Sequence, residues 1–166
     1  MSLEAPAPID ESCEIADFDS GVPLLDVWLK RRARANQASG DSRSYVVRKE
    51  RRVVAYYALA SGAVDIENAS GRMRRNMPDP VPVVVLGRLA IARDFQKRGL
   101  GRAMIGDAAR RTLQAAEIVG VRGLLVHAIS QDAKAFYLGV GFEVSPLQPM
   151  LLMATLADVR AAAKGL

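Results

Sequence analysis

The sequence predicts an α/β (α+β) fold in a single domain over residues 1–166. Three observations support this. Short runs rich in Val, Leu and Tyr are typical of strands, apolar residues spaced three and four apart are typical of helices, and the two patterns alternate along the chain. The length suits one core, and 50% apolar with 25% charged residues is an average globular composition. Disorder, collagen-like repeats and coiled coil are therefore excluded.

The first half of the chain predicts one helix and one hairpin. The helix has Ser20 as its cap and Pro23 near its start, and it ends near Gly40. Residues 43–49 and 53–63 flank a charged turn and form a β-hairpin. Residues 66–82 contain Asn, Ser, Gly and three prolines, so they form a long loop.

The second half predicts strands that alternate with helices. A buried strand, residues 83–92, is interrupted only by Gly87 and Arg88. The later elements are a helix at 99–119, a strand at 124–129, a short helix ending at Leu138, strands at 142–144 and 150–155, and a terminal helix.

Nothing in the sequence predicts a membrane or secretory protein. The longest apolar runs, residues 81–86 and 149–154, are far shorter than the roughly 18 residues that span a bilayer. The N-terminus lacks a basic segment followed by an apolar run, and Cys13 is the only cysteine. We expect a cytoplasmic protein with no membrane contact.

Charge is unevenly divided along the chain. Residues 1–29 hold seven acids and no Lys or Arg, whereas the remainder holds 11 acids and all 23 bases, a balance of +12. Eighteen of the bases are Arg, whose planar fork suits phosphate contacts. One interpretation of the Arg excess is that the protein binds a polyanionic ligand. The other is that a GC-rich genome encodes Arg in place of Lys on solvated faces.

A glycine turn at residues 96–102 lies between an apolar strand and a helix. Unpaired amides and the helix dipole favour an anion there, and Gly99 and Gly101 let the backbone approach a phosphate. Two nucleotide fingerprints do not fit, because Met104 stands where the dinucleotide motif needs a small residue and the P-loop ending is missing. The alternative is that the glycines only make a tight turn.

Residues 86–111, followed by residues 133–142, resemble the GNAT superfamily of acetyl-CoA-dependent N-acetyltransferases. Gln96, Gly99 and Gly101 fill the family signature Gln/Arg-x-x-Gly-x-Gly/Ala, and Phe136-Tyr137 and Gly141-Phe142 follow about thirty residues later. The resemblance implies a GNAT fold. This is a central mixed, mostly antiparallel sheet of six to seven strands, flanked by about four helices and splayed between the fourth and fifth strands.

The resemblance also implies a binding site for acetyl-CoA as co-substrate, with no metal. Backbone amides from Arg98 to Arg102 would hold the pyrophosphate, and the end of the buried strand would pair with the pantetheine arm. Lys97 departs from the family pattern, in which glycine is common at this place. The residues implied to bind the coenzyme are Leu89, Ala90, Ile91, Gln96, Lys97, Arg98, Gly99, Leu100, Gly101 and Arg102.

A narrower resemblance covers nearly the whole of residues 18–155. Residues 18–26, Asn36-Gln37 with residues 43–47, and residues 86–90 look like the acetyltransferase toxins of type II toxin–antitoxin pairs. That likeness implies the α-amine of an aminoacyl-tRNA as acceptor, a ribbon-helix-helix antitoxin as partner, and a homodimer.

Amine attack on a thioester needs a neutral nucleophile and a proton for the leaving thiolate. Tyr137 is the candidate acid, as its counterpart is in the family, and the alternative is a tyrosine that packs beside Phe136. His127, the only histidine, lies inside an apolar strand and is expected to be a core or strand histidine rather than a base. An α-amine, with a reference pKa of about 7.7–8.0, needs less help from a base than a lysine near 10.4.

Six bases are candidates for RNA contact, although charged runs are usually solvated faces. They are Lys30, Arg31, Arg34, Arg72, Arg74 and Arg75. Two other functions stay open. One is a GNAT enzyme that acetylates a small amine or a protein N-terminus, and the other is a coenzyme A-binding module that regulates together with an antitoxin.

Overall fold

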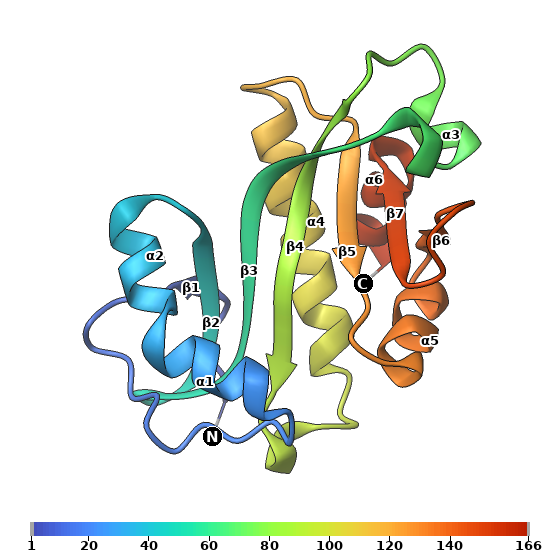
Figure 1. The fold of residues 1–166 in the computed structure, drawn as a ribbon. Helices are drawn as coiled ribbons and strands as arrows, with labels where there is room; N and C mark the ends of the chain where they lie inside the picture. The colour runs from blue at the N-terminus through green and yellow to red at the C-terminus, as the bar shows by residue number, and fades with distance from the viewer. Residues whose placement is uncertain (1, 166) are drawn as a thin grey trace. The chain divides into compact units, whose positions relative to one another are not determined.

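The computed structural model describes residues 2–165 (Figure 1). The strands are β1 (Ala7–Pro8), β2 (Arg43–Lys49), β3 (Arg52–Val64), β4 (Val81–Ile91), β5 (Gly123–His127), β6 (Glu143–Val144) and β7 (Leu151–Thr155). The helices are α1 (Pro23–Arg31), α2 (Ala33–Ser39), α3 (Gly71–Arg74), α4 (Leu100–Ala116), α5 (Gln131–Gly139) and α6 (Leu156–Gly165), with 3₁₀ turns η1 (Ile66–Asn68) and η2 (Arg93–Phe95). Among these residues, no helix is both long enough and apolar enough to cross a membrane.

The strands form a seven-stranded sheet in the order β1-β2-β3-β4-β5-β7-β6. The β1–β2, β2–β3, β5–β7 and β6–β7 pairs are antiparallel, and β4 is parallel to β5 because α4 provides the crossover between them. The β4–β5 register ends at Leu86 and Val126, although β4 continues to Ile91. This confirms the mixed, mostly antiparallel sheet with a splay between the fourth and fifth strands.

The chain divides into two compact units. One contains residues 2–60 and Gly87–Met104, and the other contains Ser61–Leu86 and residues 105–165. The elements β3, β4 and α4 each run through both units. The assignment of a single domain to residues 1–166 stays a prediction.

In the first unit, α2 lies beside β2, and α1 lies beside α2 (Figure 1). The core here is built around Tyr56, which is fully buried and donates its hydroxyl to the Leu25 carbonyl oxygen at 2.6 Å. The Phe18 ring meets Tyr56 edge-on, with centroids 5.7 Å apart. Leu29 of α1 is completely buried, so the apolar face of this helix is fixed against the core.

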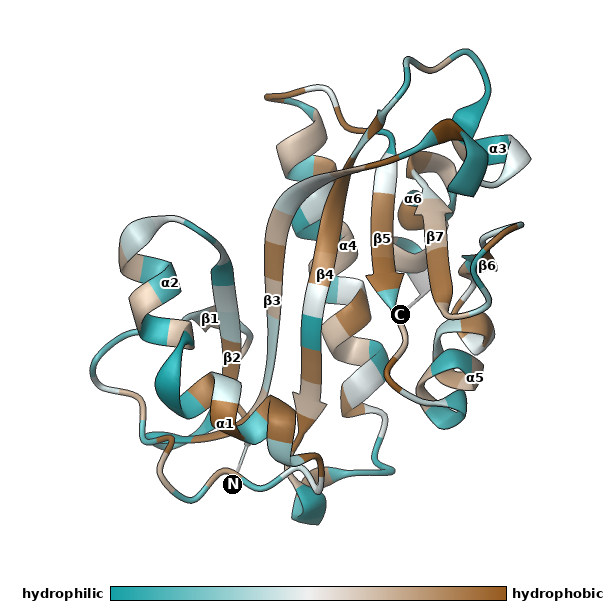
Figure 2. Cartoon of the chain, viewed as in Figure 1, coloured by the Kyte–Doolittle hydropathy of each residue, from teal (hydrophilic) through white to brown (hydrophobic). Residues whose placement is uncertain are grey.

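In the second unit, the core lies on β5 and β7, which Figure 2 shows as predominantly hydrophobic strands. Leu125 and Met153 pair across these strands and pack with Val83 of β4. The one-turn helix α3 adds the fully buried Met73, whose amide donates to the Ser70 Oγ at 3.2 Å. The serine cap and the burial of Met73 explain a helix inside the predicted loop.

The described residues form six helices instead of the expected four, because α3 forms and the first predicted helix is broken in two. The break lies at Arg32, whose φ of −119° is outside the helical range, and the next residue, Ala33, is completely buried. Ser20 is not the cap, since α1 begins after Val22. The Ser20 hydroxyl donates instead to the Asp26 carboxylate at 2.6 Å. The end of α2 at Gly40, with φ +85°, agrees with the prediction.

Candidate active site

The glycine turn connects η2 to α4 through two residues in the left-handed region. Lys97 has φ +62° and Gly99 has φ +82°. A Cβ built on Gly99 would meet no atom within 4 Å, so backbone conformation and not crowding selects glycine there. Lys97 adopts the same region without that freedom, which explains why glycine suits this place in the family.

The N-terminus of α4 offers amide groups to a ligand. Ala103 donates the first backbone hydrogen bond, to the Gly99 carbonyl oxygen at 3.1 Å. The amides of Leu100, Gly101 and Arg102 precede this bond and have no place in the helical ladder. Seventeen residues of helix direct their dipole at the same point, so the turn suits a phosphate.

Gln96 fixes the position of the turn rather than reaching into it. Its side-chain nitrogen Nε2 donates to the carbonyl oxygens of Ser20 and Ile91, both at 2.8 Å. These bonds join the turn to the last residue of β4. The Gln96 side chain therefore holds the turn through backbone groups, and its expected contact with the coenzyme stays a prediction.

The segment from Leu89 to Ile91 forms the end of β4. In the described part of the chain, the register between β4 and β5 stops before it, at Leu86. Backbone groups on the β5 side of this segment are therefore not used by that ladder. The segment fits the expected role of pairing with an extended ligand arm.

Two aromatic rings flank Tyr137: Phe136, which also lies on α5, and Phe142, which follows this helix. Its ring lies edge-on to Phe136 at 5.3 Å and to Phe142 at 5.5 Å, and the residue is 7% exposed. Burial raises the pKa of the Tyr137 phenol above its ordinary value, so the group stays protonated. Its hydroxyl has no hydrogen-bond partner within residues 2–165. The hydroxyl oxygen is not hidden from solvent.

The sequence profile of the acetyltransferase (GNAT) domain matches residues 40–144, which contain both the turn and Tyr137. The chain belongs to the GNAT acetyltransferase family. Its members use acetyl-CoA as co-substrate, and the turn at the start of α4 has the amides and the open space that a pyrophosphate requires.

Three relatives of this GNAT chain are informative. A tRNA-acetylating toxin of Mycobacterium tuberculosis (strain ATCC 25618 / H37Rv) is 49% identical over 157 residues, which cover 95% of each chain. AtaT complexed with acetyl-methionyl-tRNAfMet has a TM-score of 0.87 and 25% identity, and the match covers 96% of this chain and 98% of that one. The crystal structure of AtaTR bound with AcCoA has a TM-score of 0.81 and 27% identity, and the match covers 96% of each chain.

His127 lies in a strand, one of the two places that the sequence favoured for it, but it is not in the core. The strand was expected to continue to Ile129, whereas β5 ends at His127, which is exposed. The other residues of β5 are all buried, and the apolar run alone does not mark where this burial ends. No group of three or more His, Cys, Asp or Glu side chains is placed to hold a metal ion in the described part of this GNAT domain.

The six candidate RNA-contacting bases fall into two groups. Arg72 bridges Glu143 at 2.8 Å and Asp158 at 2.7 Å, and these carboxylates raise the pKa of its guanidinium. Arg34 donates to the carbonyl oxygens of Asp10 and Cys13. Both arginines therefore hold segments of the chain together. The other four have no ion pair or side-chain hydrogen bond within residues 2–165 and are exposed: Lys30, Arg31, Arg74 and Arg75.

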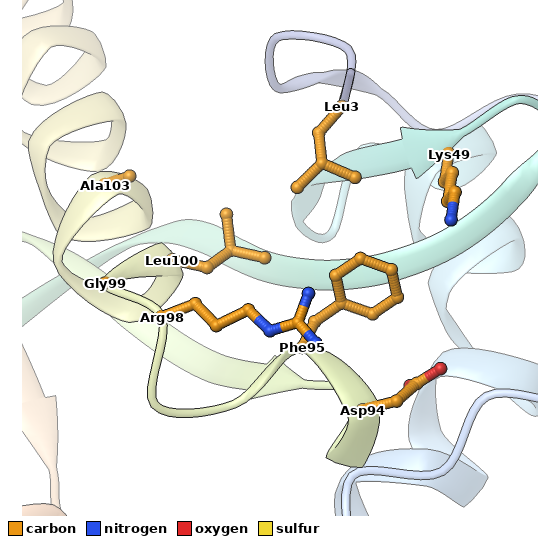
Figure 3. A pocket seen from close by; sticks show the side chains of 8 residues that line it. All are labelled: Leu3, Lys49, Asp94, Phe95, Arg98, Gly99, Leu100 and Ala103. Carbon is orange, nitrogen blue, oxygen red and sulfur yellow. The ribbon is translucent and has the colours of Figure 1, made fainter. Parts of the chain in front are cut away.

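The sequence did not predict a cationic hollow of about 460 Å³ beside the turn (Figure 3). Arg98 extends from the turn into it, with its guanidinium carbon 5.3 Å from the Phe95 ring centre. Lys49 lies over the same ring at 5.8 Å, and Asp94 is the only acid that lines the hollow among the described residues. The sequence signal that could have indicated this hollow is the presence of Phe95 and Arg98 close together at the turn. An aromatic wall with two cations suits an anionic ligand.

Proposed function

We propose that this GNAT acetyltransferase moves the acetyl group of acetyl-CoA to the α-amine of an aminoacyl-tRNA and so acts as a translation-blocking toxin. The observation that carries the proposal is the 49% identity, along 95% of both chains, to a protein named tRNA-acetylating toxin. The geometry of the turn and of Tyr137 supplies the chemistry that this activity needs.

The chain contributes binding and proton transfer. Amides of Leu100, Gly101 and Arg102 bind the pyrophosphate, and Leu89 and Ala90 orient the pantetheine arm along β4. Tyr137 donates its phenolic proton to the sulfur when the carbon–sulfur bond breaks, while the new carbon–nitrogen bond forms at the amine. The nitrogen then gives up one proton, which restores the phenol, so the products are the acetylated amine and the free thiol of coenzyme A. The raised pKa of Tyr137 keeps the phenol protonated at neutral pH before the reaction.

The acceptor is an α-amine because such a group loses its proton near neutral pH without a strong base. Lys30, Arg31, Arg74 and Arg75 supply phosphate contacts to the tRNA, and this action on charged tRNA takes place in the cytoplasm. A ribbon-helix-helix antitoxin and a homodimer complete the proposal, and both rest on the likeness to type II toxins.

Transfer of labelled acetyl from acetyl-CoA to charged tRNA tests the function. We expect label on aminoacyl-tRNA and none on the same tRNA without its amino acid. Label on polyamines or on peptide N-termini alone would favour a small-amine or N-terminal acetyltransferase. Binding of acetyl-CoA without transfer to any amine would favour a regulatory module.

The partners need separate measurements. Co-purification with the product of a short neighbouring reading frame tests the antitoxin, and sedimentation equilibrium of the isolated protein tests the dimer. A neighbour without ribbon-helix-helix character, or a monomer at micromolar concentration, would contradict these two parts and leave the catalytic proposal intact.

A further inference from the structure

A three-part stack fixes the position of Arg88 on β4. The Trp28 ring lies parallel to Tyr56, with centroids 5.9 Å apart and an interplanar angle of 7°. The Arg88 guanidinium carbon lies 5.1 Å from the centre of the Trp28 ring. Because Tyr56 is fully buried and bonded to the Leu25 carbonyl, the stack holds the charge of Arg88 in one place.

A small hollow of about 170 Å³ lies beside this stack. Small residues on the two adjacent strands, Ala58, Ala60 and Gly87, line it together with Trp28 and Arg88. A hollow of this size is well below the roughly 300–1,000 Å³ of sites for drug-sized ligands, so it suits a side chain better than a whole nucleotide.

Gly87 is not explained by packing. A Cβ at this position would meet only the Ala58 carbonyl oxygen, at 4.0 Å, which is an ordinary contact. Figure 2 shows that the mostly brown strand β4 is interrupted by a white and teal band. Glycine inside a strand often marks a place where a ligand approaches the backbone.

The polar groups that line the hollow indicate which charge a ligand should carry. Arg88 is the one charged residue among the described residues that line it. A fixed positive charge disfavours a second cation, so lysyl and arginyl side chains are disfavoured in the hollow. Ser42 also lines the hollow.

We infer that this hollow receives the aminoacyl group of the charged tRNA and that Arg88 discriminates against cationic aminoacyl groups. The inference rests on the proposed function, in which Leu89 to Ile91 pair with the pantetheine arm. Gly87 and Arg88 directly precede that segment on β4, so the hollow lies beside the path of the thioester. A reacting amine must come within about 3–3.5 Å of its target carbon.

The first test keeps the tRNA constant and varies only its amino acid, which an acylating ribozyme attaches. We compare kcat/KM for methionyl-tRNA and lysyl-tRNA, because these side chains have similar length and differ in charge. The wild type should prefer methionyl by about tenfold or more, in line with roughly 1.4 kcal/mol per factor of ten. Arg88→Met should remove most of this preference, and Arg88→Lys should retain it.

Arg32→Met is the matched control, because it removes the same charge from an exposed residue outside the hollow. It should leave the methionyl-to-lysyl ratio unchanged. An unchanged ratio in Arg88→Met would overturn the inference. A wild type that acetylates no aminoacyl-tRNA would instead overturn the proposed function.

The second test makes the hollow smaller by enlarging a residue that lines it. Ala60→Val should lower kcat/KM for methionyl-tRNA about tenfold more than for glycyl-tRNA, which has no side chain to displace. Because the measurement is a ratio, a partly unfolded variant does not disturb it. Ala35→Val, at an exposed position of α2, should leave the ratio unchanged. Equal losses for both substrates in Ala60→Val would place the aminoacyl group elsewhere.

Discussion

Gln96 Nε2 donates to the carbonyl oxygen of Ile91 at 2.8 Å, which joins the glycine turn to the end of β4. The same nitrogen bonds the Ser20 carbonyl, so a single side chain connects three segments of the chain. The signature glutamine of this GNAT chain thus fixes the position of the turn whose amides we propose to bind the pyrophosphate.

Gln96→Ala should loosen the turn while the fold survives. Two carbonyl oxygens lose their donor, so we expect a cost of about 1–3 kcal/mol in the free energy of unfolding. Acetyl-CoA affinity should fall as well, because the amides of α4 are no longer held in place. Calorimetric titration and thermal unfolding measure the two effects, and an unchanged affinity would separate Gln96 from the coenzyme site.

Lys97→Gly should stabilise the protein by up to about 1 kcal/mol, because it removes a side chain from the left-handed region. Loss of a positive charge near the phosphates should at the same time weaken acetyl-CoA binding. Urea unfolding and titration of acetyl-CoA distinguish the effects. A destabilised variant would mean that the Lys97 side chain contributes packing that outweighs its backbone strain.

Tyr137→Phe should slow acetyl transfer by roughly 10²–10⁴-fold, since the general acid is lost. Stability should change by less than about 1.5 kcal/mol, because one unpaired hydroxyl is removed and the ring contacts remain. Expression of the variant should also no longer arrest growth. Near-normal turnover in single-turnover assays would assign the proton transfer to another group.

The pH profile of wild-type turnover follows from the same group. Turnover should rise as the acceptor α-amine loses its proton near its reference pKa of about 7.7–8.0. Because the pKa of Tyr137 is raised, the acid form persists, and no alkaline decrease should appear up to about pH 10. A decrease that begins near pH 8 would point to a different acid.

Arg74→Ala with Arg75→Ala should raise the KM for charged tRNA and lower the salt dependence of binding by about one unit per lost phosphate contact. The acetyl-CoA affinity should stay constant. Arg72→Ala, the comparison variant, should lower the melting temperature instead, because it breaks the pairs to Glu143 and Asp158. If the double variant keeps the wild-type salt slope, these arginines are a solvated face.

The sequence by itself was sufficient for the order along the chain of the strands β2 to β7 and of the longer helices, for the glycine turn, and for the place of Tyr137 on a short helix. A local pattern predicts each of these features. The spacing of apolar residues predicts the helices and strands, the spacing of glycines predicts the turn, and the aromatic pair at a fixed distance from the turn marks Tyr137. The end of α2 at Gly40 and the start of α4 after Gly99 were predictable for this reason. The sequence did not predict the two-residue strand β1.

Tertiary structure alone decided which charges are available and where hollows form. Arg72 meets partners 71 and 86 residues away, and no local signal distinguishes it from Arg74 or Arg75. The Trp28–Arg88 stack and the Gln96–Ser20 bond likewise join segments distant in sequence. Such contacts depend on the path of the whole chain through the sheet, whereas helices, strands and turns depend on neighbours within a few residues.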